Sequence, residues 1–243
     1  IYDRLVGSEM CIRDRNGAKC FVLDGHVADK LIVAARTHGE DRDENGITLF
    51  IVDRDAEGLE IERTEMVDNR NAARITLCDV QVSGDAVLGD IDRGFKVLNH
   101  ALDVGRICLS AEMLGVSQEA MEQTVGYLKE REQFGRIIGT FQGLQHRAAH
   151  LFSEIEVTRS AVLKGLQGLD EDSPMTSHLA SMIKAKAGQT AVLASNEAVQ
   201  MHGGIGMTDE FDIGFFMKRA RVAQESFGDG AFHGDRLAKL AGY

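Results

Sequence analysis

The sequence lacks tryptophan and has one proline and four cysteines among 243 residues. Cys11, Cys20, Cys78 and Cys108 form no C-x-x-C pair, so neither a zinc site nor a disulfide framework is indicated. No apolar run approaches the roughly 18 residues of a membrane span, and no charged-then-apolar leader opens the chain. We therefore expect a protein of a reducing cytoplasm, that of a bacterial cell, without a membrane span.

Positive charge is also scarce. Lysine and arginine total 27 against 38 acidic residues, which gives a formal net charge of −11. Such a surface repels nucleic-acid phosphates and anionic lipid, so we expect neither as the main partner. An anionic cofactor would need local positive groups. The contents of 44% hydrophobic and 27% charged residues are those of soluble globular chains.

The first part of the chain predicts β-structure. Residues 1–15 show no period and resemble translated sequencing-adapter sequence, so we interpret them as non-native or disordered. Beyond them, apolar and β-branched runs bounded by turn signals predict an antiparallel sheet or part of a barrel. The runs are residues 20–23, 31–35, 47–52, 73–77 and 80–82, and the charged residues 38–45 are expected to form a loop.

After Gly94 the apolar residues recur at helical spacing. The stripes predict helices at 95–129, 141–169, 177–201 and 212–226, with a short last one at 231–240. Long helices with short connections predict an antiparallel four-helix bundle. The expected fold class is therefore α+β, with a barrel-like β-domain over residues 16–92 and a helical bundle over residues 93–243.

A stretch at the end of the first predicted helix carries groups suited to a cofactor. Arg131 is followed by Phe134 and Gly135, and Gln142 comes eleven residues after the arginine. An arginine, an amide and an aromatic ring can together bind a diphosphate and stack on a ring. The alternative is a charged helix end with a core aromatic and a turn glycine.

The order of three motifs makes this stretch specific. Y-x-x-x-R-x-Q-F-G from Tyr127, F-Q-x-x-Q-H from Phe141 and Q-M-H-G-G-I-G-M-T from Gln200 resemble the ordered signature of acyl-CoA dehydrogenases. The resemblance implies FAD as cofactor, bound across an interface with identical or homologous subunits. The residues it implies for FAD here are Arg131, Phe134, Gln142, Gln200, Met201, His202, Gly203 and Gly204.

Two further segments fit the same family. Residues 17–29 look like its mid-domain G-x-K-x-F-V-x-x-G-x-x-A-D segment, although many relatives have threonine where Leu23 stands. Residues 102–106 resemble its L-D-x-x-R motif at the acyl-CoA site, where Asp103 and Arg106 either bind substrate or form an intrahelical ion pair. The first segment would lie against the flavin through Phe21, Val22 and Leu23.

The family's chemistry requires a base that this sequence does not show. Its members convert an acyl-CoA thioester to a trans-2-enoyl-CoA with FAD and pass the electrons to an electron-transfer flavoprotein. The weakly acidic α-proton needs a positioned carboxylate and a polarised carbonyl. The usual Glu-Gly-Thr aligns with Phe227, Gly228 and Asp229, and the alternative base position aligns with Gly105. Neither position carries a carboxylate.

Three hypotheses follow. Asp229, flanked by Gly228 and Gly230, could act as the base, although it could equally cap the last helix; Glu225 is a weaker candidate. By resemblance, Asp229 and Gly230 also contact the cofactor and Gly228 the substrate, while the Phe227 amide polarises the carbonyl. Alternatively, the chain is a base-less partner subunit that binds FAD and acyl-CoA without catalysing alone. The third hypothesis is a helical interaction domain without a cofactor.

The resemblance covers residues 17–243 and lacks the family's N-terminal helical domain and the first half of its β-domain. We therefore expect a C-terminal fragment of a longer gene product. His146 and His150 have the i, i+4 spacing of a metal pair, but no third ligand accompanies them, so no metal is expected. His233 receives no role.

Overall fold

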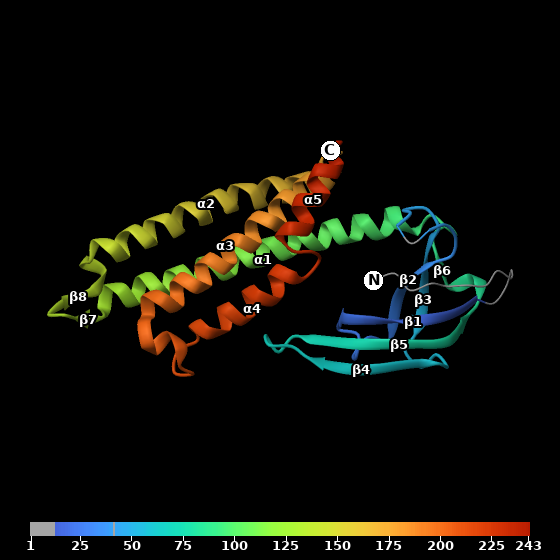
Figure 1. Cartoon of the computed structure of the whole chain (residues 1–243), viewed down its shortest axis with the longest axis horizontal. Helices are drawn as coiled ribbons and strands as arrows, with labels where there is room; N and C mark the ends of the chain where they lie inside the picture. Colours follow the sequence, from blue (N-terminus) through green and yellow to red (C-terminus); the bar gives the residue numbers. More distant parts are fainter. Residues whose placement is uncertain (1–12, 41) are drawn as a thin grey trace. The chain divides into compact units, whose positions relative to one another are not determined.

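Figure 1 shows the computed structural model of the chain, which describes residues 13–40 and 42–243. The chain divides into two compact units, one ending at Ala101 and one spanning Leu102–Tyr243. The expectation of a non-native or disordered segment at residues 1–15 falls mainly on positions outside the described residues. The backbone of residues 13–15 belongs to the first strand.

The first unit contains two antiparallel three-stranded sheets. One has the order β1 (Arg13–Leu23), β5 (Asn71–Val82) and β4 (Leu59–Glu65). The other has the order β2 (Lys30–Arg36), β3 (Ile47–Asp53) and β6 (Val87–Leu88). The predicted antiparallel β-structure is confirmed, but the described strands do not close into a barrel.

The predicted runs 73–77 and 80–82 form one strand, β5, rather than two. Asp79 interrupts their apolar pattern and has a φ of 52°, so the chain kinks there while pairing continues on both sides. Strand β4 was absent from the prediction because four of its seven residues are charged. Both sheets contribute to one core, which includes Val33, Phe50 and Ile75.

The second part of the fold is helical, as the apolar spacing predicted. Its helices are α1 (Gly94–Glu130), α2 (Gln142–Asp170), α3 (Thr176–His202), α4 (Ile213–Glu225) and α5 (Gly230–Leu240). Helices α1 to α4 run alternately in opposite directions, which confirms the antiparallel four-helix bundle (Figure 1). The short hairpin β7 (Glu132–Gln133) and β8 (Arg136–Ile137) joins α1 to α2.

Small residues let the helices of the bundle pack closely. The α1–α3–α4 core pairs Met113 with Ala187 and Ala220, all almost completely buried. A Cβ atom on Gly165 of α2 would lie 2.4 Å from Cδ1 of Ile183 on α3, so a larger residue there would force the Ile183 side chain to move. Among the described residues, no helix is long and apolar enough to cross a membrane.

Candidate active site

A tight turn at residues 226–229 connects α4 to α5 and carries Phe227, Gly228 and Asp229, which the sequence predicted to align with a base motif. Phe227 has a φ of 60° and Gly228 a φ of 104°, both in the region that favours glycine. A Cβ atom on Gly228 would lie 2.3 Å from Cδ1 of Phe232, so a side chain at this position would collide with α5. The turn therefore depends on Gly228.

The two positions predicted to correspond to a base lie against each other. A Cβ atom on Gly105 of α1 would lie 3.3 Å from both Cε2 and Cζ of Phe227. The aromatic ring thus fills the space into which a side chain at position 105 would project. Neither residue offers a proton acceptor on its side chain.

The predicted substrate residues form a buried ion pair. Nη1 of Arg106 donates to Oδ1 of Asp103 at 2.7 Å, so the intrahelical alternative is present. Arg106 also reaches the turn, because its Nε donates to the Phe227 carbonyl at 3.2 Å. The structure thereby brings Asp103 and Arg106 together with Phe227 and Gly228.

Two other elements complete the surroundings of Asp103. Its Oδ2 accepts hydrogen bonds from the Ser177 hydroxyl at 2.6 Å and from Nη2 of Arg236 at 2.9 Å. Burial alone would raise the pKa of Asp103, but the bonds from Arg236, Ser177 and Arg106 outweigh it and leave this pKa below its ordinary value. The carboxylate is therefore ionised and links α1, α3 and α5.

The structure places the candidate base Asp229 at the start of α5. Its Oδ1 accepts the Phe232 N–H at 2.8 Å, which makes it the N-cap of that helix. The capping alternative is thus present, while a role as base stays a prediction. Glu225 is exposed and pairs with Arg221 at 3.0 Å.

Two buried titratable groups near the turn, Lys184 and His233, received no role from the sequence. Lys184 is only 1% exposed, and burial lowers its pKa to about 8. His233 is also 1% exposed, and its pKa is lowered to about 4 by burial and by Arg106, Lys184 and Arg236. Lys184 had a detectable signal, because it lies on the same apolar stripe of α3 as the buried Ala180 and Ala187.

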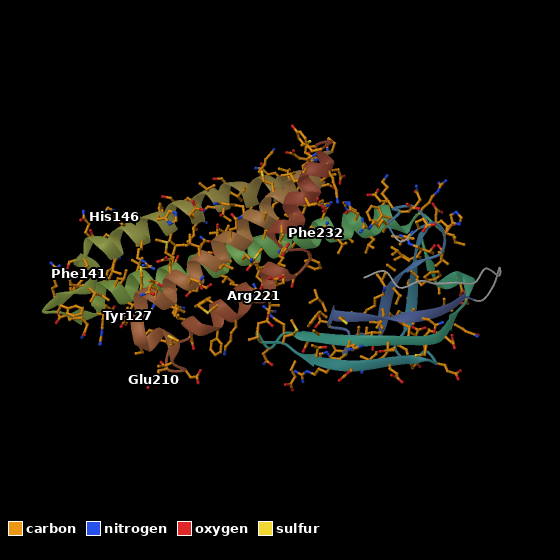
Figure 2. The ribbon with its side chains drawn as sticks, viewed as in Figure 1. Tyr127, Phe141, His146, Glu210, Arg221 and Phe232 are labelled. Atoms are coloured by element: carbon orange, nitrogen blue, oxygen red, sulfur yellow. The ribbon has the colours of Figure 1, made fainter. Side chains whose placement is uncertain are left out.

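The opposite end of the bundle carries the predicted cofactor residues of the three motifs, whereas Asp229 and Gly230 lie at the turn before α5. Tyr127 and Phe141 lie at this end, far along the bundle from Phe232 (Figure 2). Arg131, Phe134 and Gln142 are all exposed, and Phe134 is 89% exposed with a φ of 57°. The guanidinium of Arg136 lies 4.0 Å from the ring centre of Phe141, a contact that the motif did not predict.

The glycine-rich segment predicted to bind the cofactor lies at the end of α3 and just beyond it. Gln200 is exposed, and Cβ atoms on Gly203 and Gly204 would contact nothing within 4 Å, so the backbone there is open to a ligand. Met201 and His202 are buried instead. His202 stacks on Tyr127 with ring centres 4.4 Å apart, and its Nδ1 bonds the Ala198 carbonyl. Its buried Nε2 has no partner among the described residues.

The predicted flavin-side residues of the first unit end strand β1. Phe21 is 63% exposed with a φ of 55°, at a register shift between Lys19 and Val22. Leu23 is 55% exposed, whereas Val22 packs against the core of the unit. Phe21 and Leu23 therefore have open side chains.

The histidine pair on α2 remains apart from any ligand set. His146 and His150 are exposed. Within the described part of the chain, no three His, Cys, Asp or Glu side chains are grouped so that they could hold a metal ion.

Comparison with known domains identifies the family. Residues 92–241 match the acyl-CoA dehydrogenase C-terminal domain, and residues 7–81 match the acyl-CoA dehydrogenase middle domain. The chain belongs to the acyl-CoA dehydrogenase family. The resemblance inferred from the motifs is thus confirmed.

Individual members of the family are similar along most of the chain. A probable acyl-CoA dehydrogenase, YngJ, of Bacillus subtilis (strain 168) is 36% identical over 226 residues, 91% of this chain and 58% of that protein. The butyryl-CoA dehydrogenase structure from Megasphaera elsdenii is 29% identical with a TM-score of 0.88, over 95% of this chain and 60% of that chain.

A third similar structure is described as the electron transferring flavoprotein of Acidaminococcus fermentans. It is 30% identical with a TM-score of 0.88 and covers 95% of this chain and 61% of that chain. This acyl-CoA dehydrogenase family chain therefore spans about 60% of the length of the relatives it matches.

Proposed function

We propose that the full-length protein takes part in the FAD-dependent α,β-dehydrogenation of an acyl-CoA thioester to a trans-2-enoyl-CoA, and that the electrons pass to an electron-transfer flavoprotein. The observation that carries the proposal is the turn at residues 226–229. Among the described residues, the Phe227 N–H makes no hydrogen bond, although the carbonyl of the same residue is held by Arg106. This amide is available to a thioester carbonyl.

The residues of the turn would polarise that carbonyl. The flavin, when bound, accepts the hydride that leaves the β-carbon. Removal of the α-proton places negative charge on the thioester oxygen, which a fixed N–H donor stabilises. The donor is worth most where the backbone is held before the reaction, and the Arg106 bond to the Phe227 carbonyl provides such a restraint.

The spacing of the site residues supports cofactor binding across a subunit interface. Arg106 lies in the first half of α1 and Glu130 is its last residue, about 36 Å away at the rise of an α-helix. An extended FAD molecule is shorter than this separation. Arg131, Phe134 and Gln142 would therefore bind the diphosphate side of a neighbouring subunit's FAD, while the turn serves another site.

The surroundings of the turn favour a second candidate function. The Phe227 ring packs over Gly105, and the Asp229 carboxylate already caps α5. Such a chain would bind FAD and acyl-CoA as the base-less partner of a homologous subunit that supplies the carboxylate.

Free Cys20, Cys78 and Cys108 suit the bacterial cytoplasm proposed for either function.

The test is anaerobic mixing of the full-length protein with butyryl-CoA while the visible absorbance of the flavin is followed. Bleaching in the wild type that is lost in Asp229→Asn supports dehydrogenation with Asp229 as the base. Undiminished bleaching in Asp229→Asn removes Asp229 from that role. Bleaching only after addition of a homologous subunit supports the second candidate. A purified protein without flavin contradicts both.

A further inference from the structure

Lys184 is a charged side chain buried within the bundle, where Arg106, Glu225 and Asp229 are its charged neighbours. It lies on α3, is 1% exposed, and ranks among the largest fully buried side chains of the described residues. Burial of an ammonium group is costly unless hydrogen bonds replace the lost water. The hydrogen-bond partners of Lys184 therefore indicate what the buried ammonium group does in the structure.

Both partners of Lys184 are backbone carbonyls at the turn. Its Nζ donates to the Gln224 carbonyl at 2.9 Å and to the Gly228 carbonyl at 3.0 Å. Gln224 lies in the last turn of α4, where carbonyls have no helical partner and the helix dipole is negative. A cation is favoured there. Lys184 thus joins the end of α4 to the turn that follows it.

One helical turn after the lysine, α3 carries a glycine that faces Gln224 of α4. A Cβ atom on Gly188 would already lie 3.5 Å from Cγ of Gln224. A larger side chain at position 188 would push α4 away from α3. The lysine and the glycine together set the position of the end of α4.

Two successive peptide groups of the turn are held by buried cations. Arg106 binds the Phe227 carbonyl, and Lys184 binds the Gly228 carbonyl. Because a trans peptide directs its N–H away from its carbonyl, the Asp229 N–H points away from Lys184. Gly228, with its φ of 104°, would otherwise leave this stretch conformationally free.

We propose that Lys184 is a positioning residue, which holds the peptide between Gly228 and Asp229 so that the Phe227 N–H keeps the place from which it donates to the thioester carbonyl. The inference rests on the proposed function, since it needs a thioester at the turn. Lys184 touches only protein and acts through the backbone. Its role goes beyond binding, because it sets how strongly a bound carbonyl is polarised.

The experiment measures carbonyl polarisation directly. Butyryl-CoA labelled with carbon-13 at the thioester carbonyl is bound to the full-length holoprotein with its flavin already reduced, so that no turnover occurs. Infrared difference spectra then give the carbonyl stretching frequency, which falls when the oxygen accepts a stronger hydrogen bond. Lys184→Met is compared with the wild type and with Lys186→Met. Lys186 lies on the same helix and instead pairs with Glu154.

We expect the wild type and Lys186→Met to show the same lowered frequency. Lys184→Met should lose more than half of that lowering while it still binds the thioester, and its rate of flavin reduction should fall about tenfold. If Lys184→Met does not fold, Lys184→Gln is used, since its amide is one atom shorter and cannot span both carbonyls.

The outcomes separate the two proposals. A wild-type lowering that persists in full in the folded Lys184 variant overturns the inference and leaves the proposed function standing. No lowering in the wild type itself, with thioester bound, overturns the proposed donor at Phe227 and the inference with it.

Discussion

The Phe227 ring lies against Gly105, where a side chain at position 105 would otherwise project: a Cβ atom on Gly105 would lie 3.3 Å from two ring atoms of Phe227. Position 227 follows α4 and position 105 lies within α1, so two sites that are 122 positions apart in the sequence meet in the fold. The sequence motifs predict that these are the two alternative positions of the family's carboxylate base. Here, the absence of a side chain at Gly105 leaves room for the ring of Phe227.

The coupling of this pair predicts the effect of a methyl group at Gly105. Alanine normally stabilises a helix interior over glycine by about 0.5–1 kcal/mol. At Gly115, also in α1, a Cβ atom would contact nothing within 4 Å, so Gly115→Ala should show this gain in urea unfolding. Gly105→Ala should not, because its methyl group meets the Phe227 ring.

A double-mutant cycle provides the control. In a Phe227→Ala background, Gly105→Ala should regain the stabilisation that Gly115→Ala shows in the wild type. Equal gains for Gly105→Ala and Gly115→Ala in the wild-type background would show that the two residues are not coupled.

His233 predicts a pH dependence of stability. Its pKa is lowered to about 4 in the folded protein, by burial and by Arg106, Lys184 and Arg236, whereas an unfolded histidine titrates near 6.5. Between about pH 4 and pH 6.5, His233 is therefore protonated in the unfolded chain but neutral in the folded chain. Stability is complete above about pH 6.5 and falls as the pH drops toward 4, by up to about 3 kcal/mol.

Urea unfolding at several pH values between 7 and 5 checks this prediction. His233→Gln should reduce the loss of stability on acidification, since its amide does not titrate. His146→Gln, at an exposed position of α2, should leave the wild-type slope unchanged. A slope that is the same in His233→Gln and the wild type would remove His233 as its source.

Two substitutions of Asp229 distinguish its role as a helix cap from its proposed role as the base. Its carboxylate caps α5 through the Phe232 N–H. Asparagine caps as well as aspartate, so Asp229→Asn should keep the wild-type stability, whereas Asp229→Ala should lose about 1 kcal/mol. Thermal unfolding distinguishes the two variants. Equal stability of all three proteins would mean that the cap contributes nothing measurable.

Arg131, at the far end of the bundle, is predicted to contribute to the affinity of the protein for FAD. A charge-assisted hydrogen bond to a phosphate is worth about 1.5–3 kcal/mol, so Arg131→Met should weaken FAD binding about 10- to 100-fold. Flavin retained after dialysis of the full-length protein gives the measure. Arg221→Met, which removes an exposed arginine paired with Glu225, should retain the wild-type flavin content.

Most of the fold follows from local patterns in the sequence. The helices were predicted within two residues of their ends, because apolar residues recur at helical spacing over long stretches. Strand β4 was not predicted, because its four charged residues obscure the alternation of apolar and polar side chains. These residues are Glu60, Glu62, Arg63 and Glu65. Strand β4 is defined mainly by its antiparallel pairing with β5, and this pairing exists only in the folded chain.

The candidate site could be predicted only where one element carries the signal. Asp103 and Arg106 are three apart on one helix, so their ion pair was an evident alternative. The contacts of Arg106 with Phe227, and of Lys184 with Gly228, join residues 121 and 44 positions apart. No spacing rule reaches across such separations, because helix packing decides which backbone carbonyls meet a buried cation.

We propose that the turn at residues 226–229 binds the thioester and that position 227 is where its carboxylate is missing. Phe227→Glu would place one there, and Phe227→Gln is the matched variant without a base. A positioned general base contributes about 10²- to 10⁴-fold.

The most direct measurement is the rate of flavin reduction by butyryl-CoA in the full-length protein. Reduction at least about 100-fold faster in Phe227→Glu than in Phe227→Gln is the predicted result. Equal rates in the two flavin-loaded variants would contradict the claim.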